Sequence, residues 1–158
     1  MKDQTNEQLT TKIVVEFAKT IELFDLTPLE ARLFAYLYLT EGTLTLDEMS
    51  EAIGKSKTSM STSIRSLLDI NLVTRVWKKG VRKDLYQANA HLFKTFMNSY
   101  INKWIDAISH QKSSFDEIKS NLDAAPTDKN IEFLNKRLIS IMEFHKNIEK
   151  SFHHLKNN

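Results

Sequence analysis

Apolar residues recur every three or four positions along much of the chain, which is the spacing of one face of an α-helix. The first such stretch covers about residues 10–24 and includes Ile13, Phe17, Ile21 and Phe24. The second follows Thr27 and Pro28 and ends before Gly42. Thr27 before Pro28, with Glu30 three residues after Thr27, is the pattern of a helix N-cap and capping box. These two stretches predict amphipathic helices that pack their apolar faces inward.

A pair of shorter helices is predicted next, with a tight turn between them. The first begins after Leu46, with Asp47 near its N-cap, and ends at Gly54, a residue type that readily adopts the left-handed backbone of a helix end. The second begins with Ser56 as N-cap and continues to Asp69. Two helices joined by a short turn that contains glycine are typical of the helix-turn-helix motif.

The second of these helices is unusually rich in hydroxyl groups, because five Ser and two Thr lie within residues 56–69. Both residue types are mediocre helix formers. The inward face is apolar, with Met60, Ile64, Leu67 and Leu68. The opposite face is small and polar, with no acid from Lys55 through Leu68, whereas a solvated face usually carries Glu and Lys. Short polar side chains let a helix enter the DNA major groove, so this face is predicted to contact DNA. The predicted contacts are Lys55, Ser56, Lys57, Thr58, Ser59, Ser61, Thr62 and Arg65.

A β-hairpin is predicted directly after this helix. Residues 72–77 and 83–87 contain β-branched and aromatic residues in short alternation, and a basic turn with Gly80 separates them. A hairpin in this position is a wing, whose basic tip reaches phosphates or the minor groove. Trp77 is expected to anchor a strand, and Asp84 to orient a basic side chain of the wing. The predicted wing contacts are Lys78, Lys79, Arg82 and Lys83.

Long helices are predicted for the rest of the chain. Apolar residues recur at helical spacing from Asn89 to about Leu122, and residues 123–128 then form a linker. The last helix has a heptad seam, at Ile131, Leu134, Leu138, Ile141, His145, Ile148, Phe152 and Leu155. A heptad-patterned helix beside another long helix favours association of two copies, so a homodimer that reads a pseudo-palindromic site is expected.

Together these elements predict a mainly α-helical fold with a small β-hairpin wing. The predicted architecture is a winged helix-turn-helix DNA-binding domain plus long dimerisation helices. The chain is divided into an N-terminal packing or dimerisation helix at residues 1–26, the DNA-binding domain at 27–89 and a helical dimerisation region at 90–158.

The net charge of +2 conceals an uneven distribution of charged residues. Between Lys55 and Lys83 there are eight basic residues and one acid, Asp69, whereas the remainder of the chain is net acidic. One basic block on an acidic chain is the electrostatic pattern of a polyanion-binding protein, and double-stranded operator DNA is the expected partner.

Other chemistries find little support in the sequence. The chain has no Cys, and its three Gly form neither a Gly-x-Ser-x-Gly motif nor a phosphate-binding loop, so no catalytic residue and no enzymatic activity are expected. His145, Glu149 and His153 are spaced four apart, but His145 lies in the apolar seam, so no metal site or cofactor is expected. No stretch has the character of a membrane span or signal peptide, so a cytoplasmic protein without membrane contact is expected.

The run LTLDEMSEAIGKSKTSMSTSIRSLLDINLVTRVWKKGVRKDLY, Leu44 to Tyr86, resembles the MarR-like winged-helix regulators and especially their GbsR type. Helices of similar length and position extend the resemblance to most of the chain, and the C-terminal heptad helix matches as a general shape. The resemblance implies a repressor of choline uptake and glycine betaine synthesis genes in osmoprotection. It also implies DNA binding as a dimer, tuned by choline or by glycine betaine.

A small quaternary ammonium ligand such as choline is bound by aromatic ring faces, which attract a poorly hydrated cation through the ring quadrupole. Aromatic residues gather on the second helix and on the helix after the wing. The resemblance favours these rings as a ligand cage, made of Phe34, Tyr36, Tyr38, Phe96, Tyr100 and Trp104. The same rings would serve equally as residues of the core and of a dimer interface.

Two other functions remain open. One is a helical adaptor whose basic winged domain binds protein, which would be expected to carry acids on the third helix, where this chain has hydroxyls and Arg65. The other is a MarR-like regulator that answers to a different effector, for instance a lipophilic or phenolic compound. Such a regulator would share the DNA-binding surface and would fail to bind choline.

Overall fold

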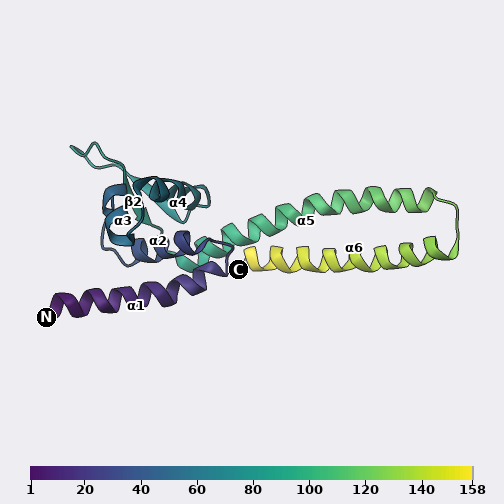
Figure 1. Cartoon of the computed structure of the whole chain (residues 1–158). Coiled ribbons are helices and arrows are strands. Elements are labelled where there is room, and N and C mark those ends of the chain that lie inside the picture. Colours follow the sequence, from purple (N-terminus) through teal and green to yellow (C-terminus); the bar gives the residue numbers. More distant parts are fainter. Residues whose placement is uncertain (158) are drawn as a thin grey trace. The chain divides into compact units, whose positions relative to one another are not determined.

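The computed structural model describes residues 1–157 and is mainly helical, with one antiparallel hairpin, which confirms the predicted fold class (Figure 1). The elements are α1 (Lys2–Glu22), α2 (Pro28–Tyr38), α3 (Leu46–Ile53), α4 (Lys57–Asp69), β1 (Val73–Val76), β2 (Leu85–Ala88), α5 (Leu92–Ala124) and α6 (Lys129–Lys156). The chain forms two compact units, one of residues 1–96 and one from Met97 onward, so the boundary falls within α5. The division into three parts at residues 26 and 89 stays a prediction. Within residues 1–157, no helix is long and apolar enough to cross a membrane.

The core of the first unit lies between α1, α2, α3, α4 and the hairpin. Each element contributes side chains that solvent does not reach or barely reaches. The buried set includes Ile21, Leu33, Phe34, Leu37, Met49, Met60, Leu67, Leu72 and Val73. This core fixes α3, α4 and the hairpin against one another.

The helix α1 is longer than predicted, and three residues of its predicted apolar stripe, Phe17, Ile21 and Phe24, pack against the core. It begins at Lys2. The spacing of apolar residues did not predict its first turns, because these turns are polar and carry no apolar stripe. The buried residues are Val14, Ala18 and Ile21, whereas Ile13 is 50 % exposed, so the predicted stripe was wrong by one position at its start. Three consecutive apolar residues from Ile13 leave the helical period ambiguous there.

The helix starts follow side-chain capping. The Thr27 hydroxyl accepts a hydrogen bond from the Glu30 N–H at 3.2 Å, as predicted. A reciprocal capping box lies instead at α3, where the Thr45 hydroxyl accepts from the Glu48 N–H at 3.2 Å and the Glu48 carboxylate accepts from the Thr45 N–H at 3.1 Å. Asp47 lies in the first turn, near the N-cap as predicted, and the helix begins at Leu46, one residue earlier than predicted, because Thr45 and Glu48 form the cap.

The hairpin is short and its register runs from Val73 opposite Ala88 to Val76 opposite Leu85. Leu44 adds an isolated antiparallel bridge to Tyr86, which ties the segment before α3 to the hairpin. Trp77 lies beyond the last strand pair and is 81 % exposed, so the prediction that it anchors a strand is wrong.

In the second unit, α5 and α6 run antiparallel as a helical hairpin (Figure 1). The rings of Trp104 and Phe152 stack with centroids 5.7 Å apart, and Phe115 meets His145 edge-on at 4.9 Å. The predicted heptad seam therefore turns partly toward α5 of the same chain. Two of its members, Leu134 and Ile141, remain 44 % and 42 % exposed.

Candidate nucleic-acid interface

The helix-turn-helix is built from α3, a three-residue turn and α4. Gly54 ends α3 with a φ of 74°, and its N–H donates to the Ser50 carbonyl at 3.0 Å. This left-handed conformation suits glycine and ends the helix. Ser56 then caps α4, because its hydroxyl accepts from the Ser59 N–H at 3.1 Å. The predicted ends of both helices at the turn are confirmed.

The two faces of α4 divide as the sequence predicts. Met60, Ile64 and Leu67 are at most 2 % exposed and hold the helix on the core. On the opposite face Thr58, Thr62 and Arg65 are exposed, and Ser59 and Ser61 are half-buried. Lys55, Ser56 and Lys57 are exposed at the start of the helix. The helix therefore presents a slim surface of hydroxyls with basic groups at both ends.

Hydrogen bonds within α4 orient several of these hydroxyls. The Ser56 hydroxyl donates to the Ser59 hydroxyl at 2.9 Å, in addition to its capping role. The Thr62 hydroxyl donates to the Thr58 carbonyl at 3.1 Å. With its proton directed to the backbone, the Thr62 oxygen presents its lone pairs outward as an acceptor, the group that an exocyclic amine of adenine or cytosine in the major groove requires.

The wing extends from the first unit beyond its helices (Figure 1). Gly80 has a φ of 81°, and the Val81 N–H donates to the Lys78 carbonyl at 3.1 Å, which closes the turn. Lys78, Lys79 and Arg82 are exposed, and no acidic side chain of residues 1–157 pairs with them. These cations are available for phosphates.

Asp84 lies beside a basic residue of the hairpin, as predicted. Its carboxylate is 3.9 Å from the Arg75 guanidinium, which also lies over the Tyr86 ring at 5.7 Å from the centroid. Arg75, on β1, is thereby held along the strand surface between an acid and a ring.

Asp47 is a residue of this surface that sequence reasoning did not assign to it. One carboxylate oxygen lies 3.3 Å from the Lys57 ammonium and the other 3.1 Å from the Lys83 ammonium. The two lysines, and Lys83 foremost, hold the pKa of the Asp47 carboxyl below its usual 3.8. No local sequence pattern predicts this bridge, because it joins residues of α3, α4 and the wing, and Asp47 and Lys83 are 36 residues apart in the sequence.

The predicted ligand residues of the first unit are Phe34, Tyr36, Tyr38 and Phe96. Phe34 is fully buried and packs edge-on against Phe96, with centroids 5.2 Å apart. It also stacks with Tyr38 at 6.3 Å. Tyr36 is half-buried at the edge of the core and makes none of these ring contacts.

Tyr38 borders a shallow hollow of about 690 Å³ on the first unit. A second ring, Phe17 on α1, lies 5.7 Å from Tyr38 and also lines it, together with the Glu16 carboxylate. Phe17 was predicted only as a core residue. In this hollow a ring pair and an acid meet solvent.

The predicted ligand residues of the second unit, Tyr100 and Trp104, lie with ring centroids 5.9 Å apart. Trp104 is 40 % exposed, and Phe152 stacks on it from α6. Phe152, predicted only as a seam residue, therefore belongs to the same ring cluster.

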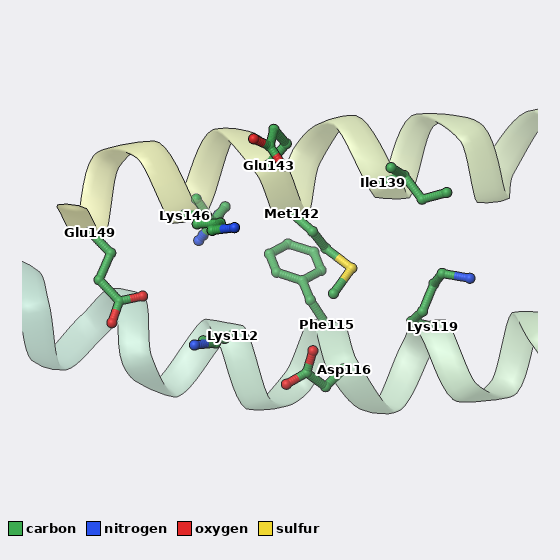
Figure 2. A pocket seen from close by; sticks show the side chains of 10 residues that line it. Lys112, Phe115, Asp116, Lys119, Ile139, Met142, Glu143, Lys146 and Glu149 are labelled. Carbon is green, nitrogen blue, oxygen red and sulfur yellow. The ribbon is translucent and has the colours of Figure 1, made fainter. Parts of the chain in front are cut away.

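A separate cavity of about 350 Å³ lies between α5 and α6, and none of the predicted ligand residues lines it. Figure 2 shows the Phe115 ring and the Met142 side chain facing each other between the two helices, with charged side chains around them. The rim carries Lys112, Asp116, Lys119, Glu143, Lys146 and Glu149. The buried Nδ1 of His145, which also lines the cavity, has no hydrogen-bond partner among residues 1–157.

A helix-turn-helix with a hydroxyl-rich second helix and a basic wing defines the class of winged-helix DNA-binding regulators. Residues 21–90 match the family model described as sugar-specific transcriptional regulator TrmB. The chain is 32 % identical over 142 residues to the putative HTH-type transcriptional regulator YvaV of Bacillus subtilis (strain 168), across 87 % of this chain and 80 % of that protein. The chain therefore belongs to the family of HTH-type transcriptional regulators that includes YvaV. These relatives are regulators and not enzymes, which confirms that expectation.

A second relative is the HTH-type transcriptional repressor GbsR of the same organism, 31 % identical over 116 residues. That alignment covers 73 % of this chain and 64 % of the length of GbsR. Among solved structures, a transcriptional regulator superposes with a TM-score of 0.66 at 19 % identity, covering 94 % of this chain and 95 % of the other. The superposition shows a shared fold.

Proposed function

We propose that this chain is a homodimeric repressor of choline uptake and glycine betaine synthesis genes, whose DNA affinity changes when choline binds. The observation that carries the DNA-binding part is the exposed hydroxyl face of α4, with Arg65 at one end and the exposed wing cations in the same unit. The resemblance of Leu44 to Tyr86 to the GbsR type and the 31 % identity to the repressor GbsR support the choice of genes.

Exposed apolar side chains on α6 support the homodimer. Five residues that a lone helical hairpin leaves in water are 42 to 62 % exposed: Phe133, Leu134, Ile139, Ile141 and Phe144. A second copy related by a two-fold axis would cover such a surface, and two winged domains then read two half-sites.

The aromatic clusters support choline as the effector. A quaternary ammonium group needs ring faces that are reachable from solvent. Trp104 with Tyr100, and Tyr38 with Phe17, meet that requirement in the two units. The fully buried Phe34 contributes by holding Tyr38 and Phe96 in place.

The test is a titration of the purified protein against a labelled DNA fragment from upstream of its own gene, with and without choline. Binding above that to random DNA, with an affinity that choline changes, is the expected result. Trp104→Ala should remove the choline effect and keep DNA binding, whereas Phe93→Ala, an exposed ring outside both clusters, should keep both. Operator binding that ignores choline would contradict the effector and leave the DNA-binding role intact.

The cavity between α5 and α6 favours a second candidate, a regulator with a different effector. Its apolar centre at Phe115 and Met142, ringed by lysines and acids, suits a small molecule with an apolar body and charged ends. Filling it with Met142→Trp separates the two candidates. An unchanged choline response in this variant supports the ring clusters, whereas the disappearance of a response to another compound supports the cavity.

A further inference from the structure

Two of the basic residues on the DNA-binding surface differ from the others in being already paired. Lys57, at the start of α4, and Lys83, at the base of the wing, each contact one oxygen of the same carboxylate, Asp47. No acidic side chain of residues 1–157 pairs with Lys55, Lys78, Lys79 or Arg82. The basic surface therefore has two lysines that are paired with Asp47, and other basic side chains that are free to contact phosphates.

The two ion pairs are weak enough to be exchanged for DNA. The three side chains are 49 to 68 % exposed, and exposed pairs of this kind contribute little to stability. A carboxylate and a phosphate oxygen are similar partners for an ammonium group, so the exchange of one for the other gains little unless the phosphate is held in place.

The two kinds of DNA complex differ in how the phosphates are held. On random DNA, contacts to the backbone supply essentially all of the binding, and the protein moves along the duplex. On an operator, base contacts from α4 fix the duplex in one register, so the same phosphates stay beside Lys57 and Lys83. A fixed phosphate acts at high effective concentration and displaces the carboxylate, whereas a transient one does not.

We infer that the Asp47 carboxylate competes with DNA phosphates for Lys57 and Lys83, and that it keeps these lysines from the phosphates of non-operator DNA and releases them on the operator. This inference rests on the proposed role of these two lysines in DNA binding. Asp47 touches no DNA in this arrangement and acts through the lysines. Asp47 lies in the first turn of α3, outside the reciprocal cap of Thr45 and Glu48, and its side chain is exposed, so Asp47→Asn leaves the core and the cap intact.

The experiment measures the salt dependence of binding for the wild type and Asp47→Asn. The probes are a random-sequence duplex and the tightest duplex that the wild type selects from a random pool. On random DNA the variant should steepen the slope of log K against log salt by about 0.9 for each lysine released, so each released lysine adds about 3.5-fold in affinity for every fourfold decrease in salt. On the selected duplex the slope should not change, so the difference between the two slopes narrows.

Two matched variants isolate the carboxylate. Asp47→Glu keeps the charge and should retain the wild-type slopes. Glu51→Gln removes the same charge from the same helix, at an exposed residue that pairs with neither lysine, and should also behave as wild type. A steeper slope for Glu51→Gln would show a general charge effect and overturn the inference.

The double variant Lys57→Gln, Lys83→Gln separates the inference from the proposed function. It should lower the slope on the selected duplex, and adding Asp47→Asn to it should then change nothing on either probe. An unchanged slope in the double variant means that these lysines do not meet phosphates, which overturns their role in DNA binding and the inference together, whereas the role of the α4 face and the wing tip would stand. A lowered slope there, with Asp47→Asn alone leaving random-DNA binding unchanged, overturns the role of Asp47 only.

Discussion

Arg65 is the long side chain on the exposed face of α4, whose other members Thr58, Ser61 and Thr62 are short. An arginine among short hydroxyl residues reaches past them to a base edge, where guanine offers two acceptors to a guanidinium. Arg65→Ala should weaken binding to the selected duplex by about 1–3 kcal/mol and relax the preference at one base pair. Competition titrations with single-base variants of the duplex measure both effects. An equal loss of affinity for random DNA would make Arg65 a phosphate contact instead.

The Asp47 bridge predicts a titration that is visible without DNA. Lys83 and Lys57 lower the pKa of the Asp47 carboxyl below 3.8 in the folded protein. The folded state therefore binds fewer protons, and the stabilisation by the bridge is present above about pH 4 and disappears as pH falls through the lowered pKa. Carbon-detected NMR of the carboxyl group measures this value, and the variant with both lysines changed to Gln should return it toward 3.8. The same pKa in both proteins would mean that the bridge does not form in solution.

For single residues, the sequence predicts a role correctly where that role depends on which face of a helix the residue lies on. The period of 3.6 residues places Met60 and Ile64 inside and Thr58 and Arg65 outside, and the structure agrees. It fails for Asp47, whose partners come from other elements. An exposed acid on a short helix is unremarkable until the fold brings two lysines to it.

The wing is the element whose contribution to binding is easiest to isolate. Its tip cations Lys78 and Lys79 are exposed and lie in a closed turn, so replacing them removes charge and leaves the hairpin register intact. Changing both to Gln should reduce the salt slope by roughly one for each phosphate that the wing no longer neutralises, on operator and random DNA alike. Glu41→Gln, an exposed site outside the surface, is the control for altered charge. A slope equal to that of the wild type would exclude the wing from the interface.

The helices and strands can be predicted from capping residues and from the spacing of apolar residues. The predicted boundaries are wrong where a capping residue or an apolar stripe is absent, or where a residue type is common both in strands and in loops. Gly54 and Ser56 mark the turn of the helix-turn-helix because glycine readily adopts the left-handed backbone of a helix end and the serine hydroxyl accepts a hydrogen bond from a helix-start N–H. The start of α1 has no cap in the form of a side chain and no apolar stripe, so the pattern begins eight residues late. Trp77 is of a residue type common in strands, so the sequence predicts it in a strand. The strand pairing in the structure ends at Val76 and Leu85, before Trp77.

For the whole molecule, the sequence predicts long association helices. It does not determine which side of each helix packs within the chain and which side packs against a second copy. The heptad seam of α6 fits equally well against α5 of the same chain or against a second copy. The structure shows both surfaces: Leu138 is 6 % exposed, whereas Phe144 is 62 % exposed. Packing within the chain therefore uses one side of the helix, and the other side is the expected dimer surface.

Phe144→Ser tests that surface directly. We expect replacement of this large ring by Ser to cost about 1.4 kcal/mol or more, so the dimer dissociation constant should rise about tenfold or more. Because two linked half-site contacts give roughly 10² to 10⁴ of avidity, operator binding at concentrations where the variant is monomeric should fall by about 10². Sedimentation equilibrium measures the first effect and the DNA titration the second, with the exposed Lys136→Ser on the same helix as control. A wild-type protein that binds its operator while sedimenting as a monomer would overturn the dimer, and would assign the exposed rings of α6 to a different partner.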